Sequence, residues 1–173
     1  MVEPMEVRPA RPDEYAMVGE LTATAYLADG PVHEKYLPAL RDAAARAAHG
    51  VLLVAVDTAT GELLGTASLF TAAAGPAWAE GASWDDAVLR MLAVAPTARR
   101  RGTGRALTRE CIRRAREMGL RRLILSTAPS MTRAHALYEQ LGFRRDPGAD
   151  WEPMPGLRLM AYRLPLREGA RIG

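Results

Sequence analysis

The chain has 173 residues, 49% of them hydrophobic and 6% aromatic, so it fits one globular domain with a core of mainly aliphatic side chains. No run of about 18 uncharged apolar residues occurs, which excludes a membrane-spanning helix, and no signal peptide is expected. The single Cys111 excludes an internal disulfide, and the three scattered histidines offer no spacing for a metal site. These features predict a cytoplasmic protein without a metal.

The first fifty residues are predicted to form one strand and two helices. A strand is expected over residues 7–10, and Asp13 is expected to cap a helix over residues 14–27. A second helix is expected over residues 32–48, disturbed in its first turns by Pro38.

Two apolar runs follow, over residues 51–56 and 62–70, and the short polar segment between them predicts an antiparallel hairpin. Residues 71–86 form a long connection that contains Trp78 and Trp84. Long connections that carry aromatic residues are often functional. The alternative is a loop that folds over the core.

A strand over residues 88–94 is followed by a turn rich in arginine and glycine and then by an amphipathic helix. A helix N-terminus offers backbone N–H groups and the positive end of the helix dipole, and glycines let an anion approach the backbone closely. The spacing matches neither a P-loop nor the dinucleotide motif GxGxxG. We predict an anion site here, and the alternative is a tight turn with solvated arginines. The candidate residues are Arg99, Arg100, Arg101, Gly102, Thr103, Gly104 and Arg105.

The net charge is +3, and ten arginines lie between Arg99 and Arg122. A nucleic-acid surface would explain this concentration, and so would an anionic cofactor or a solvated helix face. No helix-turn-helix, zinc or RNP pattern is present, so we expect no nucleic-acid partner.

The last third of the chain is predicted to form a strand at residues 121–126, a helix at residues 131–141, a strand that begins at residues 143–145, a loop at residues 146–156 and a strand at residues 157–164. Ser130 is expected to cap the helix. The apolar face of this helix contains Ala134, Leu137, Tyr138 and Leu141.

Two stretches resemble the signatures of the GNAT superfamily of acetyltransferases. Arg99-x-x-Gly102-x-Gly104 resembles the acyl-CoA signature R/Q-x-x-G-x-G/A, and AHALYEQLGF at residues 134–143 resembles A-x-x-L-Y-x-x-x-G-F. The two stretches also stand in the family's order. The resemblance implies a single α/β domain over residues 1–173, with a mixed, mostly antiparallel central sheet flanked by helices. Acetyl-CoA would lie where two central strands splay apart.

The resemblance also implies roles for individual residues. The backbone of Leu92, Ala93 and Val94 would polarise the thioester carbonyl. Tyr138 would protonate the departing thiolate. The alternative reading of Tyr138 is an aromatic side chain of the core.

The chain departs from the family pattern at two places. Many members have asparagine where Met131 stands, so one cofactor hydrogen bond is either lost or supplied by Ser130. Many members also carry a glutamate base on the central strand, but residues 88–94 contain no acid. Asp86 is the candidate base in its place, and the alternatives are Asp85, Glu80 and His135.

The predicted activity is N-acetylation: the transfer of an acetyl group from acetyl-CoA to a primary amine of a small molecule or protein. The alternative is a non-catalytic module that binds and senses acyl-CoA. No membrane partner is expected, and a homodimer is left open. The acceptor pocket is expected from residues 25–36, 78–86 and 146–156, none of which identifies the acceptor.

Overall fold

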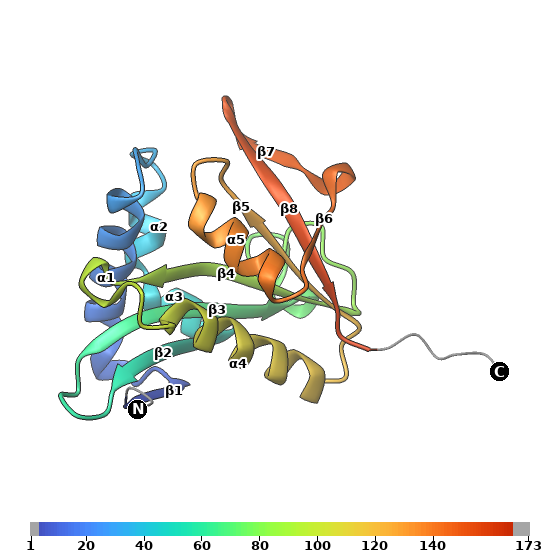
Figure 1. Ribbon diagram of the computed structural model, residues 1–173. Helices are drawn as coiled ribbons and strands as arrows, with labels where there is room; N and C mark the ends of the chain where they lie inside the picture. Colours follow the sequence, from blue (N-terminus) through green and yellow to red (C-terminus); the bar gives the residue numbers. More distant parts are fainter. Residues whose placement is uncertain (1–3, 168–173) are drawn as a thin grey trace. The chain divides into compact units, whose positions relative to one another are not determined.

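The computed structural model describes residues 4–167, and the chain divides into two compact units. The first unit contains the residues through Phe70 together with residues 89–111, and the second contains residues 71–88 and those from Ile112 onward. The boundary is therefore crossed three times, at the last residue of strand β3 (Leu63–Thr71), within strand β4 (Asp86–Val94) and within helix α4 (Thr103–Glu117) (Figure 1). The single domain expected from the sequence stays a prediction.

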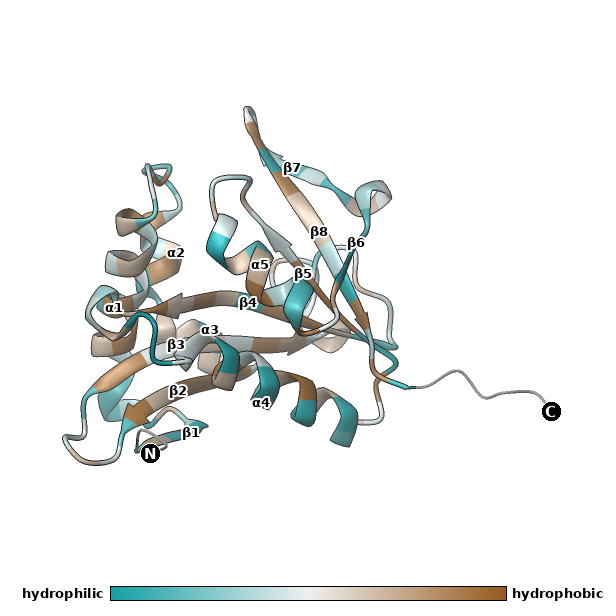
Figure 2. Cartoon of the chain, viewed as in Figure 1, coloured by the Kyte–Doolittle hydropathy of each residue, from teal (hydrophilic) through white to brown (hydrophobic). Residues whose placement is uncertain are grey.

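In the first unit, strands β1 (Met5–Pro9), β2 (Val51–Asp57) and β3 (Leu63–Thr71) are neighbours in the sheet and pair antiparallel. The hairpin of β2 and β3 is as predicted. Both strands are buried along almost their whole length, and β2 is coloured mainly as hydrophobic in Figure 2. Strand β4 follows β3 in the strand order.

Helix α1 (Tyr15–Ala28) agrees with the predicted helix, but its start differs. A 3-10 turn at Pro12–Glu14 precedes it, and Glu14 rather than Asp13 occupies the N-cap position. The Glu14 carboxylate accepts two hydrogen bonds from the Arg8 guanidinium, at 2.8 and 2.9 Å. The expected capping role of Asp13 is therefore wrong, because the chain enters the helix through a turn held by Glu14.

The single helix predicted over residues 32–48 is wrong, because the segment forms two shorter helices, α2 (Leu37–Arg41) and α3 (Ala43–His49). The break is at Asp42, whose φ of −85° and ψ of 68° lie outside the helical region. Its carboxylate accepts the N–H of Ala45 at 3.1 Å and so caps α3. The cap stabilises a new helix start at the point where the sequence pattern alone suggested continuity.

In the second unit, the first three residues of β4 pair in parallel with strand β5, from Asp86 opposite Arg122 to Val88 opposite Ile124. Strand β5 pairs antiparallel with β8, which also pairs antiparallel with β6 and β7 (Figure 1). The bounds are β5 (Arg122–Thr127), α5 (Thr132–Gln140), β6 (Arg144–Arg145), β7 (Trp151–Met154) and β8 (Leu157–Pro165).

The segment predicted as a loop over residues 146–156 contains strand β7, which forms a hairpin with β8. Pro153 inside β7 weakened the strand signal, although proline is tolerated in an edge strand. Apart from this strand and the divided helix, the element order agrees with the prediction. The fold is the expected mixed α/β type, an open and mostly antiparallel sheet flanked by helices.

Candidate active site

The turn between β4 and α4 has the backbone geometry of an anion site. Arg100 has a φ of 68° and Gly102 a φ of 77°, while Arg99 is extended at φ −67° and ψ 152°. Left-handed residues that alternate with right-handed or extended ones turn successive N–H groups toward a common concave side. Helix α4 starts directly afterwards, and its first i to i−4 hydrogen bond runs from Ala106 N–H to the Gly102 carbonyl. The binding of an anion by this turn stays a prediction.

The first residue of α4, Thr103, has a buried side-chain hydroxyl. Thr103 is 2% exposed, and its Oγ1 has no hydrogen-bond partner among the described residues. Ser68 and Thr127 also have buried hydroxyl oxygens without a partner among the described residues, so this feature is not particular to the turn. The N–H groups of Thr103 and Gly104 have no carbonyl of their own helix one turn earlier. Together these groups suit the phosphates of a nucleotide-containing ligand.

Strand β3 holds the turn by a close approach of its backbone. A Cβ added to Gly65 would lie 2.8 Å from the Ala93 carbonyl oxygen and 2.9 Å from Cγ2 of Thr103. Only glycine at this position lets β3 lie so near both the end of β4 and the start of α4. Gly65 could not be predicted as part of this region, because Ala93 and Thr103 lie far along the chain from it.

Two of the three consecutive arginines are bound to carboxylates within the first unit. Arg99 Nη2 donates to Asp29 at 2.8 Å, and Arg101 Nη2 donates to Asp57 at 3.0 Å. The hydrogen bond from Arg101 lowers the pKa of Asp57, with help from backbone N–H groups of the following turn. Arg100 is exposed. We conclude that Arg99 and Arg101 brace the turn, while the binding of a ligand by these side chains stays a prediction.

Strand β4 is distorted just before the backbone that is expected to polarise the thioester. Met91 has a φ of 52°, in the left-handed region that costs a non-glycine residue about 1–2 kcal/mol. Such strain within a strand is often found at functional sites. Ala93 is buried, and Leu92 and Val94 are half-buried. The distortion gives these three residues a backbone course that a regular strand lacks, and their role in catalysis stays a prediction.

Tyr138 lies on the buried face of α5, as its helical periodicity predicted. It is 5% exposed, with its ring centroid 5.5 Å from that of Phe143 and 6.0 Å from that of Tyr162. The packing fixes the ring, which a positioned proton donor requires and which a core aromatic also shows. The acid role of Tyr138 therefore stays a prediction.

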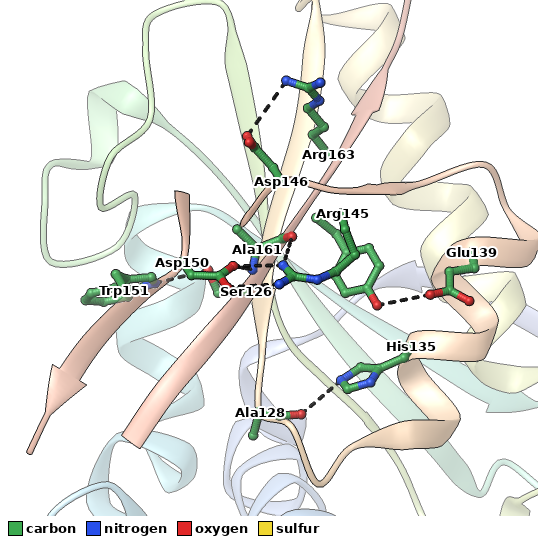
Figure 3. A network of polar contacts seen from close by, with 11 residues as sticks. Ser126, Ala128, His135, Glu139, Arg145, Asp146, Asp150, Trp151, Ala161 and Arg163 are labelled. Carbon is green, nitrogen blue, oxygen red and sulfur yellow. Dashed lines mark hydrogen bonds and ion pairs between the residues drawn. The ribbon is translucent and has the colours of Figure 1, made fainter. Parts of the chain in front are cut away.

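Tyr162 belongs to a polar network in the second unit that the sequence did not reveal. Its hydroxyl donates to Glu139 Oε1 at 3.2 Å, and the Arg145 guanidinium lies 5.5 Å from its ring centroid. Burial raises the pKa of Tyr162, and the Glu139 charge adds to the effect. Arg145 in turn binds both carboxylate oxygens of Asp150, at 2.8 and 2.9 Å, and the Ala161 carbonyl (Figure 3).

His135, one turn before Tyr138, also belongs to this region. Its ring centroid lies 5.9 Å from that of Tyr162, and Nε2 lies 2.9 Å from the Ala128 carbonyl oxygen (Figure 3). Because a carbonyl only accepts, the proton is on Nε2 and donates to Ala128. Nδ1 is then the basic nitrogen when the ring is neutral. This orientation keeps His135 open as a candidate base.

Asp86, the first candidate base, is held in an ion pair. Its carboxylate is 1% exposed and accepts from Arg122 at 2.8 and 2.9 Å and from the Ser83 N–H at 3.0 Å. Burial alone would raise the pKa of Asp86, but these hydrogen bonds outweigh it and the pKa is lowered. A general base acting near neutral pH is expected to have a raised pKa. These surroundings favour a structural ion pair, and the base role stays a prediction.

Ser130 does not cap α5 as expected. The helix begins at Thr132, and Met131 is its N-cap, without a side-chain cap bond. The backbone turns one residue later than predicted, because Met131 N–H donates to the Ala128 carbonyl at 3.0 Å. Ser130 is exposed, and its contact with a cofactor stays a prediction.

Within residues 4–167, no three or more His, Cys, Asp or Glu side chains are grouped so that they could hold a metal ion. In the same part of the chain, no helix is long and apolar enough to cross a membrane.

Comparison with known proteins identifies the class to which this fold and turn belong. Residues 15–143 match the sequence model of the acetyltransferase (GNAT) family. The chain therefore belongs to the GNAT family of acetyltransferases, and acetyl-CoA is its acyl donor. No curated protein matches the chain significantly in sequence.

Solved structures agree with the assignment. A GCN5-related N-acetyltransferase from Kribbella flavida is 28% identical, with a TM-score of 0.70 over 94% of this chain and 98% of that one. The ribosomal-protein-S18-alanine N-acetyltransferase from Escherichia coli is 20% identical, with a TM-score of 0.70 over 98% of each chain. A GNAT family acetyltransferase from Brucella melitensis, in complex with acetyl-CoA, is 24% identical, with a TM-score of 0.61 over 82% of this chain and 84% of that one.

Proposed function

We propose that this acetyltransferase is an N-acetyltransferase, which transfers the acetyl group of acetyl-CoA to a primary amine of a small molecule or protein. The observation that carries the proposal is the turn before α4, in which Arg100 and Gly102 are left-handed and which leads directly into the helix N-terminus at Thr103. The donor supplies a thioester whose carbonyl carbon accepts the amine. Direct transfer of this kind needs no protein nucleophile.

Three groups of residues have separate roles in the proposed reaction. The turn from Arg99 to Arg105 binds the pyrophosphate of the donor through backbone N–H groups at the start of α4. The backbone of Leu92–Val94, displaced by the left-handed Met91, donates to the carbonyl oxygen as negative charge develops on it. Tyr138 gives its phenolic proton to the departing thiolate, and the phenolate then regains a proton from solvent.

The base is the least supported role. Asp86 is bound to Arg122. His135 has a free lone pair on Nδ1 in its neutral form, because its Nε2–H donates a hydrogen bond to the Ala128 carbonyl. Both stay candidates for removing the proton of the ammonium ion, directly or through water. An amine that reaches the site already neutral still loses one proton after its nitrogen bonds to the acyl carbon, and this proton passes to one of these bases or to water.

The alternative that the sequence left open is a module that binds acetyl-CoA without turnover. An assay of thiol release with acetyl-CoA and a panel of primary amines separates the two. Amine-dependent release of CoA supports the enzyme. Binding of acetyl-CoA by calorimetry, with no release above the rate without amine, supports the sensor. The cytoplasmic location, the absence of nucleic-acid and membrane partners, and the homodimer left open by the sequence are untested predictions.

A further inference from the structure

An apolar cluster in the first unit surrounds the distorted residue of β4. We call it the Met91 cluster. Its buried members are Ala23, Leu40 and Met91, and the half-buried side chains packed against them are Tyr26, Val32, Tyr36 and Leu37.

The position of this cluster relates it to the reaction. Met91 directly precedes Leu92–Val94, the backbone proposed to bind the thioester carbonyl. The half-buried members come from the last turn of α1, from the connection after it, and from the first residue of α2. These side chains stay partly exposed beside the strand where the acyl group is transferred. An acceptor that reaches this strand from the α1–α2 side meets them first.

The exposed part of the cluster is aromatic. Tyr26 and Tyr36 meet edge to face, with ring centroids 6.4 Å apart and an interplanar angle of 61°. Val32 and Leu37 add aliphatic surface beside them. A surface of this composition gains most by burying an apolar group.

The carboxylates near the cluster are engaged elsewhere. Glu20 binds Arg41 at 3.1 Å, Asp29 binds Arg99 at 2.8 Å, and Asp42 caps α3. Glu34 is exposed. Glu20, Asp29 and Asp42 are already engaged by an arginine or by a helix N-terminus, which weakens their attraction for a further positive charge on the acceptor.

A buried cation lies close to the same tyrosines. Arg46 is fully buried and donates to the carbonyls of Ala39 and Leu40, both at 2.9 Å, and to Thr22 at 3.2 Å. Burial lowers the pKa of Arg46, and the nearby Tyr26 and Tyr36 phenols oppose the shift. Its positive charge adds repulsion against any second cation that an acceptor brings to this place.

We propose that the acceptor is a small monoamine with an aromatic or aliphatic body, and that the Met91 cluster selects it against polyamines and lysine-rich peptides. The inference rests on the proposed acetyl transfer and adds the chemical class of the acceptor. The body of the amine packs on Tyr26, Tyr36 and Leu37, and the single amino group points to the acyl carbon.

Two matched pairs of amines test the proposal with the wild-type protein. Hexylamine and 1,6-diaminohexane have the same carbon chain and differ in the second ammonium group. 2-Phenylethylamine and ethylamine share the aminoethyl group and differ in the ring. We expect kcat/KM to be at least about tenfold higher for hexylamine and for 2-phenylethylamine than for their partners. A preference for the diamine, as a cation–π surface would give, or equal rates within the pairs, would overturn the inference.

Variants locate the selection at the cluster. Tyr36→Ala should raise KM for 2-phenylethylamine and leave KM for ethylamine nearly unchanged, and Tyr36→Phe should restore the preference. Met17→Ala removes an exposed side chain of α1 outside the cluster and should change neither value. Leu37→Ala replaces Tyr36→Ala if that variant does not fold. Unchanged preference in the folded variant would overturn the assignment to this cluster.

The proposed function and this inference fail in different ways. If acetyl-CoA binds but no amine of the panel is acetylated, both fail. If spermidine or a lysine-rich peptide is acetylated faster than the monoamines, the acetyl transfer stands and the inference fails.

Discussion

Substitution of Gly102 tests whether the turn before α4 binds the phosphates of CoA. Gly102 has a φ of 77°, and a Cβ placed on it would meet nothing within 4 Å, so Gly102→Ala would introduce backbone strain without a clash. The expected cost in the free energy of unfolding is about 1–2 kcal/mol. We also expect weaker binding of CoA, because the N–H groups that face the phosphates would shift.

Gly61 provides the matched control. It lies in the turn between β2 and β3 with a φ of 75° and equally open surroundings. Gly61→Ala should lose similar stability in chemical denaturation and keep the affinity for CoA measured by calorimetry. Equal CoA affinity in the two variants would show that the turn does not hold the phosphates.

Tyr138→Phe tests the proton donor. The substitution keeps the ring between Phe143 and Tyr162 and removes the hydroxyl, so kcat should fall about 10²-fold, with little change in KM or in CoA affinity. Tyr162→Phe removes a second hydroxyl of the same cluster, one bound to Glu139, and should cost stability rather than rate. A fully active Tyr138→Phe enzyme would mean that water protonates the thiolate.

Asp86→Asn distinguishes a base from a structural ion pair. We expect a loss of stability, because the Arg122 guanidinium would lose the negatively charged carboxylate to which it now donates two hydrogen bonds. We expect kcat/KM to change only a few-fold. A fall of about 10²-fold or more, with stability retained, would instead restore Asp86 as the catalytic base.

At the scale of elements, the link between β1 and the turn before α1 should make stability depend on pH. Arg8 holds the pKa of Glu14 at about 2, below its ordinary 4.5, through two hydrogen bonds. A lowered carboxyl pKa stabilises the folded state above the unfolded pKa, and the contribution is lost as the pH falls from 4.5 toward 2. Denaturation between pH 7 and 2 should show this loss in the wild type.

Glu14→Gln should be less stable at pH 7 and should lose less stability on acidification. Glu20→Gln is the control, because Glu20 forms an exposed pair with Arg41, and such pairs contribute little. If Glu14→Gln and the wild type keep the same difference in stability from pH 7 to 2, the ion pair does not contribute as described.

Helix periodicity predicted the buried faces of α4 and α5 but not the division of residues 32–48 into two helices. The period of α5 predicted the buried face that carries Tyr138, because helix periodicity is a local property. The period of α4 likewise predicted the burial of Leu107 and Cys111, although Met118 at its end is 46% exposed. The division of residues 32–48 could not be predicted from periodicity, because it depends on the Asp42 cap.

At the scale of the whole molecule, the order of most elements along the chain and the family could be predicted from the sequence, because they rest on apolar runs and on two short motifs. The partners of the charged residues could not. Asp86 binds Arg122, which is 36 residues away, and Tyr162 binds Glu139, which is 23 residues away. Such pairs depend on how strands are placed in the sheet, and a single sequence does not carry that information in its local pattern.

The central claim is that this chain acetylates amines with acetyl-CoA. The most direct measurement is thiol release by purified protein with acetyl-CoA and 2-phenylethylamine, combined with mass spectrometry of the amine. We expect CoA and N-acetyl-2-phenylethylamine to form in equal amounts, at a rate that rises with amine concentration and then saturates. Tight binding of acetyl-CoA with no acetylated amine, from this amine or from the rest of the panel, would contradict it.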